Sequence, residues 1–217
     1  MMNNELQKRI LSAIILIPLT LFIIIKGSYF FNFFIFICLI ITLYEWYLMS
    51  KNKFYNVPGF FLIILSFYSL YILRHDTDID LTIIILILII CISTDVGGYA
   101  FGKLLKGPKL TKISPNKTYS GMIGSFFLSI IFSIIYLDYF NIYIIVKAEI
   151  ISFFDFIFII VVSSISQMGD IFVSYFKRKS KIKNTGKIIP GHGGILDRID
   201  GMIFVFPSTC LILNLIN

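Results

Sequence analysis

The sequence predicts an all-α, polytopic integral membrane protein, and three observations support that fold class. Hydrophobic residues make up 58% of the 217 positions and charged residues only 14%, whereas a soluble domain carries about 25% charged residues. The apolar residues gather in long runs, and a helix needs about 20 of them to cross a bilayer. The lysines and arginines form short groups between these runs, which is typical of loops beside anionic lipids.

We expect about seven membrane-spanning helices, and more if the long sixth run is divided. The runs cover residues 10–25, 29–49, 58–73, 81–102, 120–138, 150–175 and 201–217. Pro18 lies in the first run, where a membrane helix can accommodate it as a kink. Lys8 and Arg9 precede this run as in a signal peptide, but no small-residue cleavage site follows it. We therefore expect the first run to be retained as a helix.

The positive charges predict which ends of the helices face the cytoplasm. With the N-terminus inside, fifteen lysines and arginines fall in the inner segments 8–9, 51–53, 103–117 and 177–187. Only Lys26, Arg74 and Lys147 fall in outer loops. The positive-inside rule then predicts a cytoplasmic N-terminus and an odd number of spans. Because the charges form no continuous basic surface, we expect membrane lipids and no nucleic acid as partners.

One membrane domain with two parts accounts for the layout of the chain. Residues 1–94 form the N-terminal transmembrane helices, and residues 95–217 form the predicted catalytic region. This second part holds the two longest polar stretches, the basic loops 103–119 and 177–199. The oligomeric state stays open, with a homodimer as one option.

Four carboxylates occupy positions that are costly in a membrane protein. Asp95 falls in the fourth run, Asp170 in the sixth, and Asp197 and Asp200 at the start of the seventh. A charged group at mid-span costs about 2.5–3.5 kcal/mol on insertion scales and marks function by default. Each of the four lies near the cytoplasmic end of its run, so we expect them to converge at one depth. The alternative is that they only pair with nearby lysines and arginines to hold helices together.

Polar residues recur along one face of the sixth run. They are Ser163, Gln167, Asp170, Ser174 and Lys177. Spacings of three and four residues place them on one side of a helix, which must face protein or water rather than lipid. On the fourth run, glycines at 97, 98 and 102 leave room beside Asp95 for another helix or a ligand. Two other carboxylates, Glu45 and Asp155, are interpreted as interfacial residues without a function.

Carboxylates opposite lysines and arginines predict a phosphate substrate held together with a metal ion. Oxygen ligands without Cys or His favour Mg²⁺, which binds through one or two carboxylates and the substrate phosphates. Lys and Arg would neutralise the remaining phosphate charge. The glycine-rich segment 190–194 can cradle a phosphate with its backbone N–H groups. His192 within it is either a phosphate contact or a turn histidine with a backbone partner.

Three segments of the chain share their pattern with a known family. The longest of these segments begins with Ser174-Tyr-Phe-Lys177-Arg178, with Gly169-Asp170 just ahead of it. It leads through Pro190-Gly-His192-Gly-Gly194 to Leu196-Asp197-Arg198-Ile199-Asp200. The others are Asp95-Val-Gly97-Gly98-Tyr99 and Ser114-Pro115-Asn-Lys117-Thr118, followed by Gly121. Together they resemble segments of the phosphatidate cytidylyltransferases, and the segment from Ser174 to Asp200 resembles the long C-terminal motif of that family. Two positions depart from that family: Asn184 and Ser120 stand where its members usually or often carry an acidic residue.

The resemblance implies a reaction, a cofactor and a location. CTP and phosphatidic acid would give CDP-diacylglycerol and pyrophosphate with a divalent metal, Mg²⁺, and a second cation is an option. The chain would lie in the inner membrane with its active site near the cytoplasmic face. The resemblance also implies metal binding by Asp170 and Asp197, supported by Asp200.

For the other residues of the site we form hypotheses. Lys177 and Arg178 would act catalytically by holding phosphates, and Asp95 would orient a basic partner or a second cation. The remaining substrate-binding residues would be Ser174, Lys117, Thr118, His192, Gly193, Gly194 and Arg198.

Three other classes of function make different predictions. A transporter or channel would spread its carboxylates through the depth of the membrane, whereas these cluster at one side. A lipid or polyprenol kinase would require ATP. A CDP-alcohol phosphotransferase would show an Asp-Gly-x-x-Ala-Arg type of run, which this sequence lacks.

Overall fold

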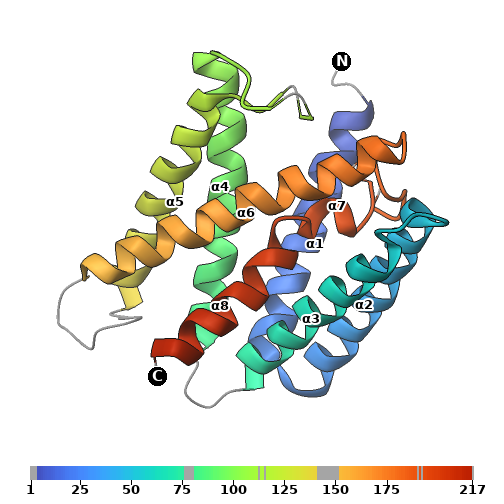
Figure 1. Cartoon of the computed structure of the whole chain (residues 1–217). Coiled ribbons are helices and arrows are strands. Elements are labelled where there is room, and N and C mark those ends of the chain that lie inside the picture. Colours follow the sequence, from blue (N-terminus) through green and yellow to red (C-terminus); the bar gives the residue numbers. More distant parts are fainter. Residues whose placement is uncertain are drawn as a thin grey trace.

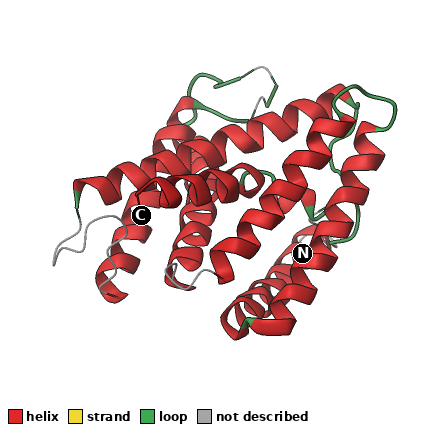
Figure 2. Ribbon diagram, turned by 60° about the horizontal axis from the view of Figure 1, so that its bottom comes forward, coloured by secondary structure: helices red, strands yellow, loops and turns green. Residues whose placement is uncertain are grey.

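A computed structural model describes residues 4–75, 81–111, 113–114, 116–140, 152–189, 191 and 193–216, without the side chains of 4–13, 17 and 216. These residues form helices and loops (Figures 1 and 2), together with two isolated β-bridges, Lys109 to Thr118 and Ile189 to Gly193. The helices are α1 (Asn4–Lys26), α2 (Ser28–Ser50), α3 (Asn56–His75), α4 (Leu81–Leu105), α5 (Tyr119–Phe140), α6 (Phe153–Lys179), α7 (Leu196–Ile199) and α8 (Met202–Ile216).

The helices follow the apolar runs of the sequence, and the chain is a membrane protein. Among the described residues, five helices are long and apolar enough to cross a bilayer: α2, α3, α4, α5 and α6. Shorter apolar stretches lie in α1, over Ile14–Lys26, and in α8, over Met202–Leu215. Large apolar side chains such as Phe33 and Phe61 are about 70% exposed, which suits a surface covered by lipid. The four-residue helix α7 was not predicted.

Glycines allow α4 and α5 to pack against each other with their backbones almost in contact. A Cβ added at Gly97 would overlap the carbonyl of Gly124, and one at Gly121 would lie 2.7 Å from the carbonyl oxygen of Gly98. The Ser125 hydroxyl bridges the pair by donating to the Thr94 carbonyl at 2.7 Å. The sequence left open whether the glycines at 97 and 98 make room for another helix or for a ligand. In the structure they make room for the helix α5.

The long helix α6 crosses α4 and α5 and also packs against α8 (Figure 1). It begins with a capping box in which the Ser152 hydroxyl accepts from the Asp155 N–H, and the Asp155 carboxylate accepts from the Ser152 N–H at 2.8 Å. Asp155 is completely buried, so its prediction as an interfacial residue is corrected: it caps a helix. At its other end, α6 carries Phe176, which packs on Trp46 and Tyr55.

The ends of several helices meet on one side of the molecule. The start of α1, the turn between α2 and α3, the loop between α4 and α5, and the loop after α6 lie along the upper and right-hand edges of Figure 1. The end of α8 lies at the opposite, lower side. The first group contains both basic loops that the sequence singled out, and it contains the site described next.

Candidate active site

One face of α6 carries the central residues of the site. Asp170, Ser174 and Lys177 follow one another at intervals of four and three residues, and the Ser174 hydroxyl donates to Asp170 Oδ1 at 3.2 Å. Two turns earlier, the Ser163 hydroxyl lies 2.8 Å from that of Thr94 on α4. The polar stripe therefore faces protein, as its spacing predicted.

Lys177 joins two carboxylates, one within α7 and one directly after it. Its Nζ donates to Asp197 Oδ1 at 3.1 Å and to Asp200 Oδ2 at 3.4 Å. The exposed fractions of the three side chains are only 10%, 6% and 14%. An ion pair with so little access to water is screened weakly by salt, so these charges act strongly on one another.

A second lysine reaches the site from the loop between α4 and α5. Lys117 Nζ lies 2.5 Å from Asp170 Oδ2, and both side chains are about one-quarter exposed. Three segments distant in the sequence thus bring alternating charges together: the loop before α5, one face of α6, and the residues at and after α7. Of the predicted residues, Asp170, Ser174, Lys177, Lys117, Asp197 and Asp200 are gathered by contacts.

Asp95 belongs to the same electrostatic group without a direct bond to it. It is exposed on α4 and interacts through charge with Asp170, Lys117 and Arg198. The pKa of Asp200 is raised to about 7, mainly by burial and also by the negative charge of Asp170, while the Lys177 ammonium lowers it. A nearby cation stabilises the ionised form of such a carboxyl group, and Lys177 is that cation here.

The glycine-rich loop after α6 is tied to Asp197. Asp197 Oδ2 accepts from the N–H groups of Thr185 at 2.8 Å and Gly194 at 3.0 Å. Gly193 has φ +94, and a Cβ there would lie 2.6 Å from Asp197 Oδ2, so only glycine fits. His192 lies outside the described residues. The N–H groups of Gly193 and Gly194, which were predicted to bind phosphate, already have acceptors within the protein. Gly194 donates to Asp197 Oδ2, and Gly193 donates to the Ile189 carbonyl at 3.1 Å.

Two predicted residues have other partners. Arg178 is exposed, and its Nη1 donates to the Ile182 carbonyl at 3.3 Å, so it extends the end of α6 rather than joining the carboxylates. The Thr118 hydroxyl accepts from the Gly121 N–H at 3.1 Å and thereby caps the start of α5. Roles for these residues in binding phosphate stay predictions.

Glu45 on α2 is the residue that the sequence analysis missed. It was interpreted as interfacial, yet it is 1% exposed and lies against the glycine-rich loop. Its Oε2 accepts from the Thr185 hydroxyl at 3.0 Å and the Leu196 N–H at 2.9 Å, and its Oε1 accepts from the Ile195 N–H at 3.1 Å. The signal that could have found it is the same as for Asp95: a carboxylate inside an apolar run.

The implied Mg²⁺ would have to find its ligands among carboxylates that already have partners in this structure. In the part of the chain that is described, no three Asp, Glu, His or Cys side chains converge as ligands of one ion. Both oxygens of Asp197 are already used, by Lys177 and by two backbone N–H groups. The oxygens of Asp170 and Asp200 also have partners: Ser174 and Lys117 for Asp170, and the Gly201 N–H and Lys177 for Asp200. A lysine can exchange a carboxylate for a phosphate, which would free one oxygen of each for Mg²⁺, an ion that typically binds through one or two carboxylates and substrate phosphates. The residues therefore fit a magnesium ion that arrives with a phosphate substrate.

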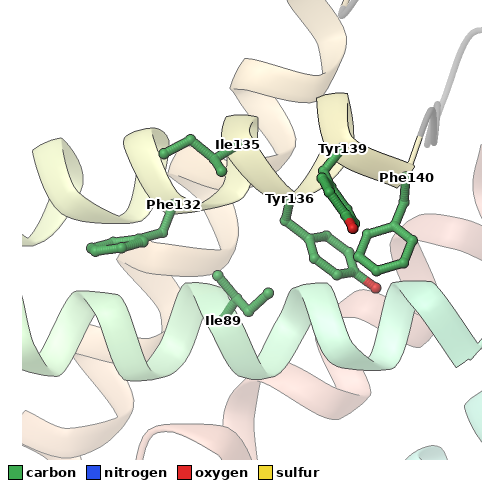
Figure 3. A pocket seen from close by; sticks show the side chains of 6 residues that line it. All are labelled: Ile89, Phe132, Ile135, Tyr136, Tyr139 and Phe140. Carbon is green, nitrogen blue, oxygen red and sulfur yellow. The ribbon is translucent and has the colours of Figure 1, made fainter.

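An apolar pocket of about 270 Å³ lies elsewhere, between α4 and α5 (Figure 3). It is lined by Ile89, Phe132, Ile135, Tyr136, Tyr139 and Phe140. Its residues on α5 are at the end of that helix remote from Lys117, so the pocket is separate from the charged site.

Comparison with known proteins decides the family. A model of the cytidylyltransferase family matches residues 7–77 and 60–216. The chain belongs to the cytidylyltransferase family. A phosphatidate cytidylyltransferase of Rickettsia bellii is 35% identical to it over 213 residues, which cover 94% of this chain and 89% of the relative. One of Staphylococcus haemolyticus is 34% identical over 176 residues, which cover 76% of this chain and 63% of the relative.

The two positions where this cytidylyltransferase departs from the expected family pattern have different surroundings. Ser120 donates its hydroxyl to the Lys106 carbonyl and lies 3.0 Å from the Thr118 hydroxyl, so it fastens the basic loop to the start of α5. Asn184 is exposed next to Gly193. Neither position contributes to the contacts among Asp170, Lys177 and Asp200.

Proposed function

We propose that this chain is a phosphatidate cytidylyltransferase, which transfers CMP from CTP to phosphatidic acid and releases pyrophosphate. The proposal rests on the family and on one observation, the alternation of lysines and carboxylates from Lys117 through Asp170 and from Lys177 to Asp200. Such a site has cations for the phosphates and carboxylates for the metal ion that accompanies them.

The chemistry asks little of the protein beyond alignment and charge. An anionic oxygen of the phosphatidate headgroup forms a bond to the α-phosphorus of CTP, and the bond from that phosphorus to the bridging oxygen breaks. The electron pair of this bond leaves with pyrophosphate. Because the nucleophile belongs to the lipid, no side chain is needed to form a covalent intermediate. The rate then depends on orientation and on stabilisation of negative charge.

The contacts suggest a division of roles. Lys117 and Lys177 would exchange their carboxylate partners for substrate phosphates, because an ammonium group can satisfy either. Asp170 and Asp200 would hold Mg²⁺, and the ion would stabilise charge on the phosphates when bound. Asp197 would keep the glycine-rich loop in place from behind. Asp95 and Arg198 would set the charge at the edge of the site.

We also propose the topology that the sequence favours. Seven helices, α1 to α6 and α8, would cross the inner membrane with a cytoplasmic N-terminus. The side that carries the basic loops would then face the cytoplasm, where CTP is found, and the inner-leaflet headgroup would lie at the same level. The positive-inside rule supports this orientation.

The decisive experiment uses the purified chain in detergent with labelled CTP, phosphatidic acid and Mg²⁺. The expected result is CDP-diacylglycerol that depends on Mg²⁺, with ATP unable to replace CTP. An Asp200→Asn variant is expected to lose this product, and a matched Asp138→Asn variant, altered at an exposed carboxylate at the far end of α5, is expected to retain it. A folded wild type that makes no product with CTP would refute the proposal, and phosphorylated lipid made with ATP would indicate a kinase.

A further inference from the structure

The buried Glu45 carboxylate has an unusual set of partners for a residue on a membrane helix. No lysine or arginine among the described side chains forms an ion pair with it. Its contacts come instead from hydrogen-bond donors of the loop that links α6 to α7, namely the Thr185 hydroxyl and the N–H groups of Ile195 and Leu196. All three are donors, which is what an ionised carboxylate accepts.

The loop is shaped to fit this carboxylate. A Cβ added at Gly186 or at Gly194 would overlap the Glu45 carboxylate oxygens, so the backbone approaches the carboxylate more closely than any larger residue permits. Each of these glycines flanks a residue that bonds Glu45, Thr185 in one case and Ile195 in the other. The two ends of the loop therefore close around one side chain of α2.

Thr185 connects Glu45 to the candidate active site. Its hydroxyl donates to Glu45, while its N–H donates to Asp197 Oδ2 at 2.8 Å. Asp197 in turn accepts from Lys177, which also bonds Asp200. A continuous chain of hydrogen bonds thus runs from α2 through the loop and Asp197 to Lys177 and Asp200, two of the residues proposed to act on the substrates.

We propose that Glu45 is a positioning residue: it fixes the described parts of the loop, residues 184–189 and 193–196, against α2, so that Asp197 holds Lys177 and Asp200 in place for the triphosphate of CTP. This inference rests on the proposed function. Glu45 touches no substrate itself, because it is 1% exposed and both oxygens are occupied. A buried charge is costly unless it is fully hydrogen-bonded, and packing alone would be served as well by an apolar side chain. The loop geometry is what the carboxylate adds.

The Glu45→Gln variant tests this directly. Glutamine keeps the size of the side chain but places an NH₂ group where a backbone N–H needs an acceptor. Whichever way the amide is turned, it faces either the Ile195 N–H or the Leu196 N–H with a donor. We expect the KM for CTP to rise about tenfold or more, with the KM for phosphatidic acid within about twofold of the wild type. Glu45→Asp keeps a carboxylate on a side chain one methylene shorter, and its KM for CTP should lie between those of the wild type and Glu45→Gln.

A matched control lies one turn away on the same helix. Thr42 is completely buried, and its hydroxyl donates to the Cys38 carbonyl within α2. Thr42→Val alters a buried polar group of α2 without removing a bond to the loop, so both KM values should stay within about twofold of the wild type. A rise in the KM for CTP in Thr42→Val equal to that in Glu45→Gln would assign the effect to general damage to α2 and overturn the proposal.

A second measurement is independent of activity. Lys183, directly before the loop, and Lys187 within it are exposed, and trypsin cleaves after lysine where the backbone can open. Without substrates, Glu45→Gln should be cut at these positions about tenfold faster than the wild type, and Thr185→Val should be cut at an intermediate rate. If Glu45→Gln fails to give a monodisperse protein, Thr185→Val carries both measurements.

The two proposals fail in different ways. A wild type without cytidylyltransferase activity would refute the proposed function, while the cleavage comparison would still report on the loop. An active wild type whose Glu45→Gln variant shows an unchanged KM for CTP and unchanged cleavage would overturn the role of Glu45. Faster cleavage with an unchanged KM for CTP would also overturn it, because the loop would then be free to open without consequence for the nucleotide.

Discussion

Replacing Lys177 by methionine isolates the central ion pairs of the site. Methionine keeps the unbranched shape of the side chain and removes the ammonium that bonds Asp197 and Asp200. These two carboxylates are almost entirely shielded from water, with side-chain exposed fractions of 6% and 14%. Removing one partner of a buried ion pair destabilises a protein by about 3–5 kcal/mol, because a buried charge is left uncompensated. At about 2–4 °C per kcal/mol for a chain of this size, the melting temperature should fall by about 10 °C.

The size of this loss should depend on pH. Burial raises the pKa of Asp200 to about 7, and Lys177 is one of the groups that hold it down, so the variant should have a still higher value. A carboxyl group whose pKa is raised on folding favours the folded state at low pH, and this contribution is lost as the pH rises through the folded-state pKa. The difference in melting temperature between Lys177→Met and the wild type should therefore be smaller at pH 6 than at pH 8.

The assay is thermal unfolding of both proteins in the same detergent, in metal-free buffer, at pH 6, 7 and 8. Adding Asp200→Asn to Lys177→Met removes the uncompensated charge and should recover a large part of the lost stability, since contacting residues do not act additively. A melting temperature within about 2 °C of the wild type at every pH would show that Lys177 does not compensate these carboxylates, and the reasoning would be wrong.

Three further predictions concern other parts of the site. Asp170→Asn should lower kcat by about a hundredfold or more and raise the Mg²⁺ concentration needed for half-maximal activity, because one proposed metal ligand is lost; chelation by EDTA should abolish activity and added Mg²⁺ should restore it. Lys117→Ala should raise the KM for CTP about tenfold, whereas Arg178→Ala should change it by less than about threefold, because Arg178 is exposed and bonds the Ile182 carbonyl; equal effects in steady-state kinetics would contradict this ranking. Gly97→Ala should cost about 1–3 kcal/mol, measured by thermal unfolding, because its Cβ would overpack α4 against the Gly124 backbone. Gly102→Ala on the same helix is the control: its Cβ would meet the Thr118 hydroxyl at 3.1 Å and no backbone atom closer than 3.7 Å, so it should cost less.

Much of the fold follows from hydrophobicity alone. Each predicted apolar run has its helix, because the bilayer leaves a long apolar segment little alternative to satisfying its backbone internally. The face of α6 with Asp170, Ser174 and Lys177 was predictable for a related reason: the helical period places them together, and lipid excludes them. Their partners on α7 and in the 103–119 loop were grouped correctly because one membrane depth is a strong restriction.

Contacts across long stretches of sequence were not predictable in the same way. Glu45 stands in an apolar run next to Trp46, and nothing in its neighbourhood shows that Thr185 and Leu196 will meet it. Asp155 was interpreted as interfacial, although the preceding Ser152 contains the local signal of a capping box. Thr118 is predicted to contact phosphate, which stays a prediction, and its hydroxyl has a second role that was not predicted, as the cap of α5. Short polar residues at helix starts often serve the helix first, and the sequence does not separate that role from binding.

The hydrogen bonds between Glu45 and the loop can form only late in the synthesis of the chain. The two partners are separated by 140 to 151 residues, and at about 5–20 residues per second a ribosome needs roughly 7–30 s to make that length of chain. During this interval α2 enters the bilayer with a carboxylate that has none of its native donors. The free-energy cost of the Glu45 carboxylate in the membrane is thus highest before the catalytic loop has been made. Once the loop is present, its donors satisfy the carboxylate and remove that cost. Quality control that recognises an unsatisfied charge in a membrane helix would in this way distinguish finished molecules from truncated ones.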